Sequence, residues 1–199
     1  MFGCLDSPNQ DVEIKTIESV CEKITDGTHQ TPIYSDSGYL FLSSKDVKNG
    51  YIDWSNIRFI SQELHNELSR RVSPQRNDIL LAKNGTTGIA ALVETDEIFD
   101  IYVSLALLRP KQDINPTYLL SAINNDMTKC QFDAGLKGIG VPNLHLSVIK
   151  EVKILVATTK AQNHFAEFVK QADKSKFEIQ RTIDALEATY KSILKENLG

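Results

Sequence analysis

The segment TKAQNHFAEFVKQADKSKFEIQRTIDALEATYKSILKEN, residues 159–197, contains neither proline nor glycine. Within it, a heptad spacing of alternating steps of four and three residues is sustained over about four heptads, which predicts a coiled-coil-forming helix. The predicted interface positions are Phe165, Val169, Ala172, Lys176, Ile179, Ile183, Leu186, Tyr190 and Ile193. A helix of about 38 residues would be ~57 Å long, far more than one small domain needs to cover its sheet. We therefore expect this helix to reach a partner; a helix folded back on its own domain is the alternative.

The predicted helix has a capping signal at its start and one polar interruption. Thr159 and Gln162 match the capping box, in which a hydroxyl and an amide each bond an otherwise unpaired backbone N–H group. Lys176 stands where an apolar residue is expected. Such a residue typically fixes register or partner choice at a cost in stability, although a lysine that extends along the interface to solvent gives the same pattern.

Residues 1–157 have a different pattern, in which short apolar runs bounded by Gly, Pro, Asn, Asp or a charge predict β-strands. These runs are Tyr39–Leu42, Asp78–Ala82, Gly88–Val93, Ile101–Leu108 and Val152–Val156. Three helices are predicted between them. One begins at Asn115-Pro116 and ends at about Lys129, one is capped by Ser61 and ends at about Arg70, and one covers Thr16–Ile24. The sequence therefore predicts an α/β (α+β) globular domain with a mixed sheet over residues 1–157, followed by one long coiled-coil-forming α-helix over residues 158–199.

The composition is that of a folded chain, with 41% hydrophobic and 24% charged residues. No apolar run approaches the ~20 residues of a membrane helix, and residues 1–10 lack a signal-peptide pattern, so we expect a cytoplasmic protein. Cys4, Cys21 and Cys130 lack metal-ligand spacing and are predicted to be buried or half-buried free thiols. The net charge of −4 disfavours nucleic-acid binding, so any DNA contact must depend on a local basic face.

The chain lacks catalytic motifs of specific spacing. Its two glycine-rich stretches have neither the spacing nor the Lys-Ser or Lys-Thr pair of a phosphate-binding loop, and no Asn-Pro-Pro-Tyr or Asp-Pro-Pro-Tyr occurs. A metal-dependent nuclease site would require Asp133, Glu151 and Lys153 to converge. We predict that Asp133 lies in a loop and that Glu151 begins a strand. We expect a non-catalytic chain without a bound metal and keep the nuclease as an alternative.

Two loop segments place polar side chains beside glycine. The first is Asp26-Gly27-Thr28-His29, and the second, Lys83-Asn84-Gly85-Thr86-Thr87-Gly88, follows a predicted strand. Hydroxyls, an amide and a cation on such loops suit contacts to phosphates and base edges. The same residues equally suit ordinary turns.

In their order along the chain, these segments resemble the specificity subunits of type I restriction-modification systems. The resemblance depends on Asp26–His29 with Pro32, Tyr39–Val47 with Gly50, Asp78–Gly88, Val141–Leu144 and Gln162–Ala166. It covers nearly the whole chain and implies one target-recognition domain plus one conserved helix. A full-length member has two recognition domains separated by two antiparallel helices. This chain is therefore expected to be either a self-pairing half-subunit or a piece of a longer chain, and Met1-Phe2-Gly3 resembles the junction before a second recognition domain.

The resemblance implies a function in DNA recognition. The chain would read one half of a bipartite site in double-stranded DNA and contact modification subunits that methylate adenine at N6. S-adenosylmethionine would be bound by those partners and no cofactor by this chain; restriction motor-nuclease subunits are further expected partners. The long helix would pair with a second copy or with the second half of the subunit, and so act as a spacer. It would also contact the modification subunit. From loop chemistry, the candidate DNA-binding residues are Thr28, His29, Lys45, Lys83, Asn84, Thr86, Thr87 and Lys137. The alternative is an interaction module that dimerises through its coiled coil without binding DNA.

Overall fold

A computed structural model of the chain describes residues 3–136 and 142–198. Its central sheet is antiparallel, with the strand order β4-β11-β8-β9. The strands are β4 (Cys21–Asp26), β8 (Ile79–Ala82), β9 (Ala90–Leu92) and β11 (Leu105–Pro110). Successive residues of β8 are all apolar because both faces of the sheet are covered. The cross-strand pair Leu80–Leu107 lies in one hydrophobic cluster, and the next pair, Ile79–Leu108, lies in the other.

A second sheet, with the order β10-β6-β7-β5, packs against one face of the central sheet. Its strands are β5 (Tyr34–Ser35), β6 (Tyr39–Leu42), β7 (Arg58–Ile60) and β10 (Phe99–Ile101). β10 runs parallel to β6 and the other pairs are antiparallel, which confirms the expected mixed sheet. Leu42 and Phe99 belong to the buried cluster between the two sheets, together with Leu80 and Leu107.

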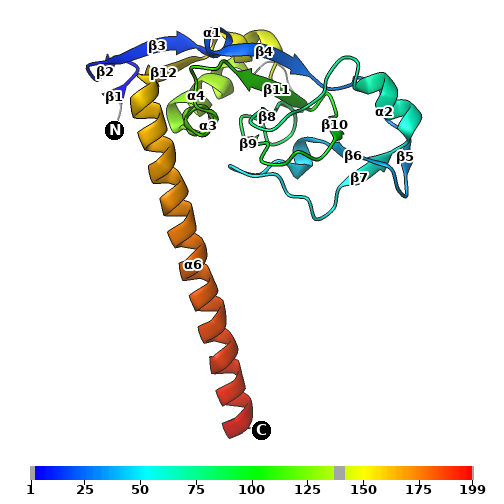
Figure 1. Ribbon diagram of the computed structural model, residues 1–199, viewed down its shortest axis with the longest axis vertical. Coiled ribbons are helices and arrows are strands. Elements are labelled where there is room, and N and C mark those ends of the chain that lie inside the picture. Colours follow the sequence, from blue (N-terminus) through cyan, green and yellow to red (C-terminus); the bar gives the residue numbers. More distant parts are fainter. Residues whose placement is uncertain (1–2, 137–141, 199) are drawn as a thin grey trace.

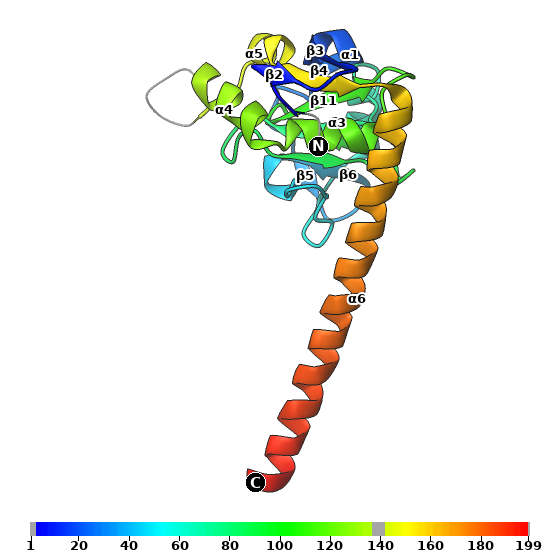
Figure 2. The same cartoon turned by 90° about the vertical axis from the view of Figure 1, so that its left-hand side faces the viewer.

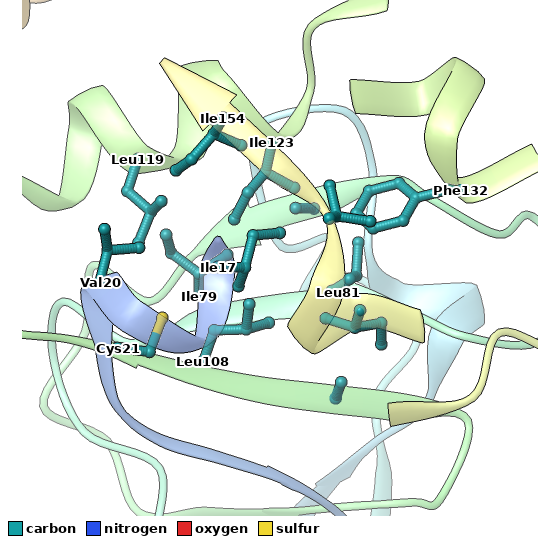
Figure 3. Packing of buried hydrophobic residues seen from close by; sticks show 14 of the residues in the cluster. Ile17, Val20, Cys21, Ile79, Leu81, Leu108, Leu119, Ile123, Phe132 and Ile154 are labelled. Atoms are coloured by element: carbon teal, nitrogen blue, oxygen red, sulfur yellow. The ribbon is translucent and has the colours of Figure 1, made fainter. Parts of the chain in front are cut away.

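Helices and a two-stranded sheet cover the other face of the central sheet. They are β3 (Val12–Thr16), α1 (Ile17–Val20), α3 (Pro116–Ile123), α4 (Asp126–Gly135), α5 (Leu146–Glu151) and β12 (Lys153–Ala157), and β12 pairs antiparallel with β3. Figure 3 shows Ile17, Leu119, Phe132 and Ile154 from these elements in one cluster with Ile79 and Leu81 of the central sheet. Cys21 and Cys130 are free thiols, as expected; Cys21 is buried, but Cys130 is exposed, whereas buried or half-buried thiols were predicted.

The remaining short elements lie at the edges of this domain. β1 (Gly3–Cys4) and β2 (Ser7–Pro8) form a small hairpin, η1 (Ser44–Asp46) is a 3-10 turn after β6, and α2 (Gln62–Leu68) follows β7. Ser61 caps α2 by accepting a hydrogen bond from the Leu64 N–H group at 3.3 Å, as its position in the sequence predicted.

Three predicted elements differ in their boundaries. The helix expected to start at Asn115 is broken at Asn124, whose side-chain amide pairs with both backbone groups of Ala90 at the edge of β9, each at 2.9 Å. The strand expected at Ile101–Leu108 is interrupted by the turn 102–104, which separates β10 from β11 and so connects the two sheets. The helix expected at Thr16–Ile24 is the single turn α1, after which the chain enters β4.

The long helix α6 (Thr159–Leu198) extends away from the domain as a straight arm in both views (Figures 1 and 2). This confirms the expected class, an α+β domain followed by one long helix. The capping box was predicted one residue too late, because the Oγ1 of Thr158 is the acceptor, bonded by the Ala161 N–H group at 3.4 Å. The Gln162 side chain, 2% exposed, instead joins the helix to the domain. Its amide donates to the Ala157 carbonyl at 2.8 Å and accepts from the Asn115 N–H group at 2.9 Å.

Only the first turns of α6 contact the domain, where Phe165 packs edge-on against Tyr118 with ring centroids 5.7 Å apart. From Lys170 onward, every residue of α6 whose side chain is described is exposed. The exposed apolar residues include Ile179, Ile183 and Leu186 of the predicted interface. Within the described residues, no helix is both long and apolar enough to cross a membrane.

Candidate nucleic-acid interface

The turn 102–104 brings together loops that lie far apart in the sequence. The Thr28 N–H group donates to the Ile101 carbonyl at 3.1 Å, and the Thr28 carbonyl accepts from the Val103 N–H group at 2.9 Å. Ser104 accepts a hydrogen bond from the Ser44 N–H group on its Oγ at 3.0 Å and one from the Lys83 N–H group on its carbonyl at 2.8 Å. Three of the motifs noted in the sequence therefore meet at one turn.

Gly27 makes this meeting sterically possible. A Cβ atom at this position would collide with the Ile101 carbonyl and with the backbone of Tyr102. Only a residue without a side chain therefore lets the strand end of β4 approach the turn so closely. The Asp-Gly-Thr-His segment thus owes its glycine to backbone packing, and its Thr28 and His29 follow at the surface.

Asp26 is buried, and the side chains of Lys83, His29 and Arg71 lie around its carboxylate. One of its oxygens lies 2.6 Å from Lys83 Nζ and 3.5 Å from His29 Nε2, and the other lies 2.8 Å from an Arg71 nitrogen. Asp26 and Lys83 are each 5% exposed, whereas the side chains of Arg71 and His29 are 54% and 65% exposed. Asp26 therefore neutralises the buried ammonium group of Lys83 and positions the exposed side chains of Arg71 and His29.

The electrostatic balance at Asp26 favours its charged form. Burial acts to raise the pKa of this carboxyl, but the hydrogen bond and charge of Lys83, together with His29 and Arg71, outweigh burial and lower the pKa. Asp26 is consequently ionised at neutral pH, so the ion pair with Lys83 persists.

The second loop was predicted to present Lys83, Asn84, Thr86 and Thr87 to DNA. Lys83 is instead held inside by Asp26, so its ammonium supports the loop from within. Asn84 is half-buried and bridges to Asn143, while Thr86 is exposed and Thr87 half-buried around the turn at Gly85. The Leu144 N–H group donates to the Lys83 carbonyl at 2.8 Å, which places the later Pro142-Asn143-Leu144 motif beside this loop. Lys137 lies outside the described residues.

Two hollows border the turn 102–104, and we call them together the turn surface. The first is lined by Val103 of the turn and by Asp26, His29, Lys83, Asn84, Asn143 and His145. The second is lined by Tyr102 and Ser104 of the turn and by Tyr34, Lys45, Lys48, Asn56 and Arg58. Asp46 and Asp53 also line the second hollow. Asp46 accepts hydrogen bonds from Ser43, and Asp53 accepts them from Ser55, whose hydroxyl lies at 2.6 Å. Asp53 also lies 3.9 Å from Lys48 Nζ.

The structure therefore brings His29, Lys45 and Asn84 to the turn surface, with Lys83 buried at its base. Thr28 forms part of its backbone frame. Sequence reasoning missed Arg58, Lys48 and Arg71. Lys48 directly precedes Asn49-Gly50, a turn signal that could have pointed to it. Arg58 has no glycine beside it, and only the long-range pairing of β5, β6 and β7 places it at this surface.

The residues of the alternative nuclease hypothesis occupy other positions than expected. Asp133 lies in α4 and not in a loop, and Glu151 ends α5 and does not open a strand. Lys153 begins β12 and pairs through its backbone with the Gln131 side chain. Among the described residues, no group of three or more His, Cys, Asp and Glu residues could hold a metal ion.

The chain is thus an α+β domain carried on a helical arm, with polar and cationic side chains gathered around one turn. The chain belongs to the type I restriction modification DNA specificity domain family, whose model matches residues 9–188. This membership gives the chain a role in DNA target recognition, within a family of subunits that is in general non-catalytic.

Three solved structures have a similar fold. One comes from a study of complex assembly and conformational transition of the type I R-M system, with 16% identity and a TM-score of 0.70 over 96% of this chain and 46% of that chain. The S subunit from M. genitalium has 18% identity and a TM-score of 0.57 over 87% and 44%. The HsdS subunit from Thermoanaerobacter tengcongensis has 13% identity and a TM-score of 0.57 over 88% and 40%. The chain thus spans less than half the length of each of these relatives.

Proposed function

We propose that this chain recognises one half of a bipartite double-stranded DNA target and directs a partner N6-adenine methyltransferase to it. The observation that carries the proposal is the family match over residues 9–188. The chain also covers 40–46% of the similar solved chains, which accords with a single recognition domain and a single helix.

The turn surface is the part of the chain that contacts DNA in this proposal. Lys45, Lys48 and Arg58 give its second hollow three cations against two carboxylates, a local excess of positive charge on a chain whose net charge is −4. Such cations fix the position of a protein on the phosphate backbone, while hydrogen bonds to base edges select the sequence. Arg71 and His29, oriented by Asp26, extend this surface around the turn.

The exposed apolar positions of α6 provide the contact to a second helix, from another copy or from a second half of the subunit. If two copies pair, the assembly has a two-fold axis, and the DNA target is then a symmetric palindrome with an interruption. Chemistry belongs to the partners: modification subunits supply S-adenosylmethionine and methylate adenine, and motor-nuclease subunits join them for cleavage.

A methylation assay tests this function. The purified chain is mixed with the modification subunit encoded beside it, S-adenosylmethionine is added, and the methylated adenines in a random duplex pool are sequenced. A recurrent interrupted motif is the expected result, and its symmetry reports whether the chain pairs with itself. A stable complex that methylates no motif would argue for a missing second half, and the absence of any complex would contradict the proposal.

A second candidate function is an interaction module that dimerises without binding DNA. The exposed apolar residues of α6 and the acidic net charge favour it. Direct binding of the chain to duplex DNA at two salt concentrations separates the two functions, because only a DNA-recognition domain loses affinity steeply as salt rises.

A further inference from the structure

The outer face of the mixed sheet carries an aromatic layer. Phe41 pairs with Arg58 across β6 and β7, and Tyr34 pairs with Ile60, two residues from Arg58. Because side chains alternate along a strand, Tyr34, Phe41 and Arg58 share one face. Phe41 is only 2% exposed, and its ring lies 6.1 Å from that of Tyr34 and 6.2 Å from that of Tyr102. Phe41 is therefore covered on this face, whereas the Tyr34 ring at its edge remains partly open to water.

Arg58 lies on top of this layer, with its guanidinium carbon 4.4 Å from the centroid of the Tyr34 ring. Arg58 is exposed, and Tyr34 is 40% exposed. The ring attracts the guanidinium through a cation–π contact, which does not use the N–H groups as hydrogen-bond donors to another side chain. In the described part of the chain, no side-chain hydrogen bond or ion pair of Arg58 is present.

Three other arginines differ from Arg58 in how they are held. Arg71, Arg76 and Arg109 each donate to a carboxylate, those of Asp26, Asp96 and Asp78 respectively. The two carboxylates that line the same hollow as Arg58 are already engaged, Asp46 by Ser43 and Asp53 by Ser55 and Lys48. Arg58 is therefore oriented by an aromatic ring, and its donors remain available to a ligand.

We propose that Arg58, held on the Tyr34 ring, reads a guanine of the DNA target in the major groove. This inference rests on the proposed function and names one residue that determines its specificity. Guanine presents two acceptors, O6 and N7, on one edge, and the two parallel N–H groups of a guanidinium match them. A fixed guanidinium loses little freedom when both bonds form. Lys45 and Lys48, which line the same hollow, serve the neighbouring phosphates, for which a point charge on a flexible stem suffices.

The test is selection of bound duplexes from a random pool by the purified chain, compared with Arg58→Lys and Tyr34→Leu. In Arg58→Lys the positive charge stays while the planar pair of donors is lost. We expect one position of the enriched motif to lose its guanine preference about tenfold or more, with the other positions unchanged. Tyr34→Leu keeps Arg58 but removes its support, and should weaken the same position only. Arg181→Lys is the matched control, because Arg181 is exposed on α6 away from the turn surface.

The outcomes separate the two levels of the proposal. An unchanged motif with Arg58→Lys would overturn the assignment of Arg58 while leaving DNA recognition intact. So would a uniform loss of affinity in Arg58→Ala with a smaller dependence on salt, which is the signature of a phosphate contact. If the unaltered chain selects no motif and binds no duplex, both the proposed function and the assignment of Arg58 fail. Circular dichroism and urea unfolding show that each variant is folded before selection.

Discussion

Replacing Lys83 by methionine tests whether this lysine supports the turn surface from inside or contacts DNA. At the 2.6 Å separation of Lys83 Nζ and Asp26 Oδ2, the direct attraction is ~6 kcal/mol for an effective dielectric constant of about 20. Desolvation offsets much of this, and removing one partner of a buried pair typically costs ~3–5 kcal/mol. Because Arg71 still neutralises part of the Asp26 charge from 2.8 Å, we expect a loss at the lower end, ~3 kcal/mol of unfolding free energy.

Urea unfolding measures this loss directly, and thermal unfolding should show a midpoint lower by ~6–12 °C for a chain of this size. At a temperature where Lys83→Met remains folded, the slope of log affinity for DNA against log salt should equal that of the unaltered chain. Lys45→Met is the matched control, since Lys45 is exposed. It should change stability by less than ~0.5 kcal/mol and lower the salt slope by about 0.9. If Lys83→Met were as stable as the unaltered chain and lost the salt slope instead, the buried ion pair would not be the role of Lys83.

Three further predictions concern pH, the root of α6 and its exposed face. Because the folded pKa of Asp26 is below its ordinary value of 3.8, its stabilising contribution is present above about pH 4 and is lost as pH falls through the folded pKa. Unfolding free energy should therefore drop less steeply below pH 4 in Asp26→Asn than in the unaltered chain, and equal slopes in urea titrations would contradict this. Gln162→Ala should cost ~2–4 kcal/mol in urea unfolding because two buried hydrogen bonds lose their partner, whereas Gln180→Ala, exposed on the same helix, should cost less than ~0.5 kcal/mol. Ile183→Glu should weaken self-association or pairing with the second half in sedimentation velocity, and Lys176→Leu should strengthen it; no change in either would show that another face of α6 makes the contact.

The sequence allowed prediction of those features whose causes are local. The heptad spacing predicted α6, the Ser61 hydroxyl predicted the start of α2, and the apolar run at Asp78–Ala82 predicted β8 to within a residue. In each case the residues that form the element also carry its signal, so neighbours in sequence suffice.

The arrangement of the turn surface depends on pairs that are distant in the chain. Thr28 bonds to Ile101 and Val103, and the ion pair of Lys83 is with Asp26, 57 positions earlier. A lysine at the start of a glycine-containing loop looks the same in sequence whether it is exposed or neutralised by such a carboxylate. The break in the predicted helix has a local signal, because Asn125 caps α4 by accepting a hydrogen bond from the Met127 N–H group at 2.9 Å. The pairing of Asn124 with Ala90 at the edge of β9, by contrast, joins residues that are distant in the chain.

Gln162 also has a mechanical consequence. The 40 residues of α6 form a lever of ~60 Å whose direction is set at its root, where one buried amide ties the helix to both β12 and the start of α3. A tilt of about 3° at that root would displace the far end by ~3 Å, close to the ~3.4 Å rise of one base pair. If the arm sets the distance between two half-sites, the angular stiffness at Gln162 determines whether the assembly tolerates a spacing that is wrong by a single base pair.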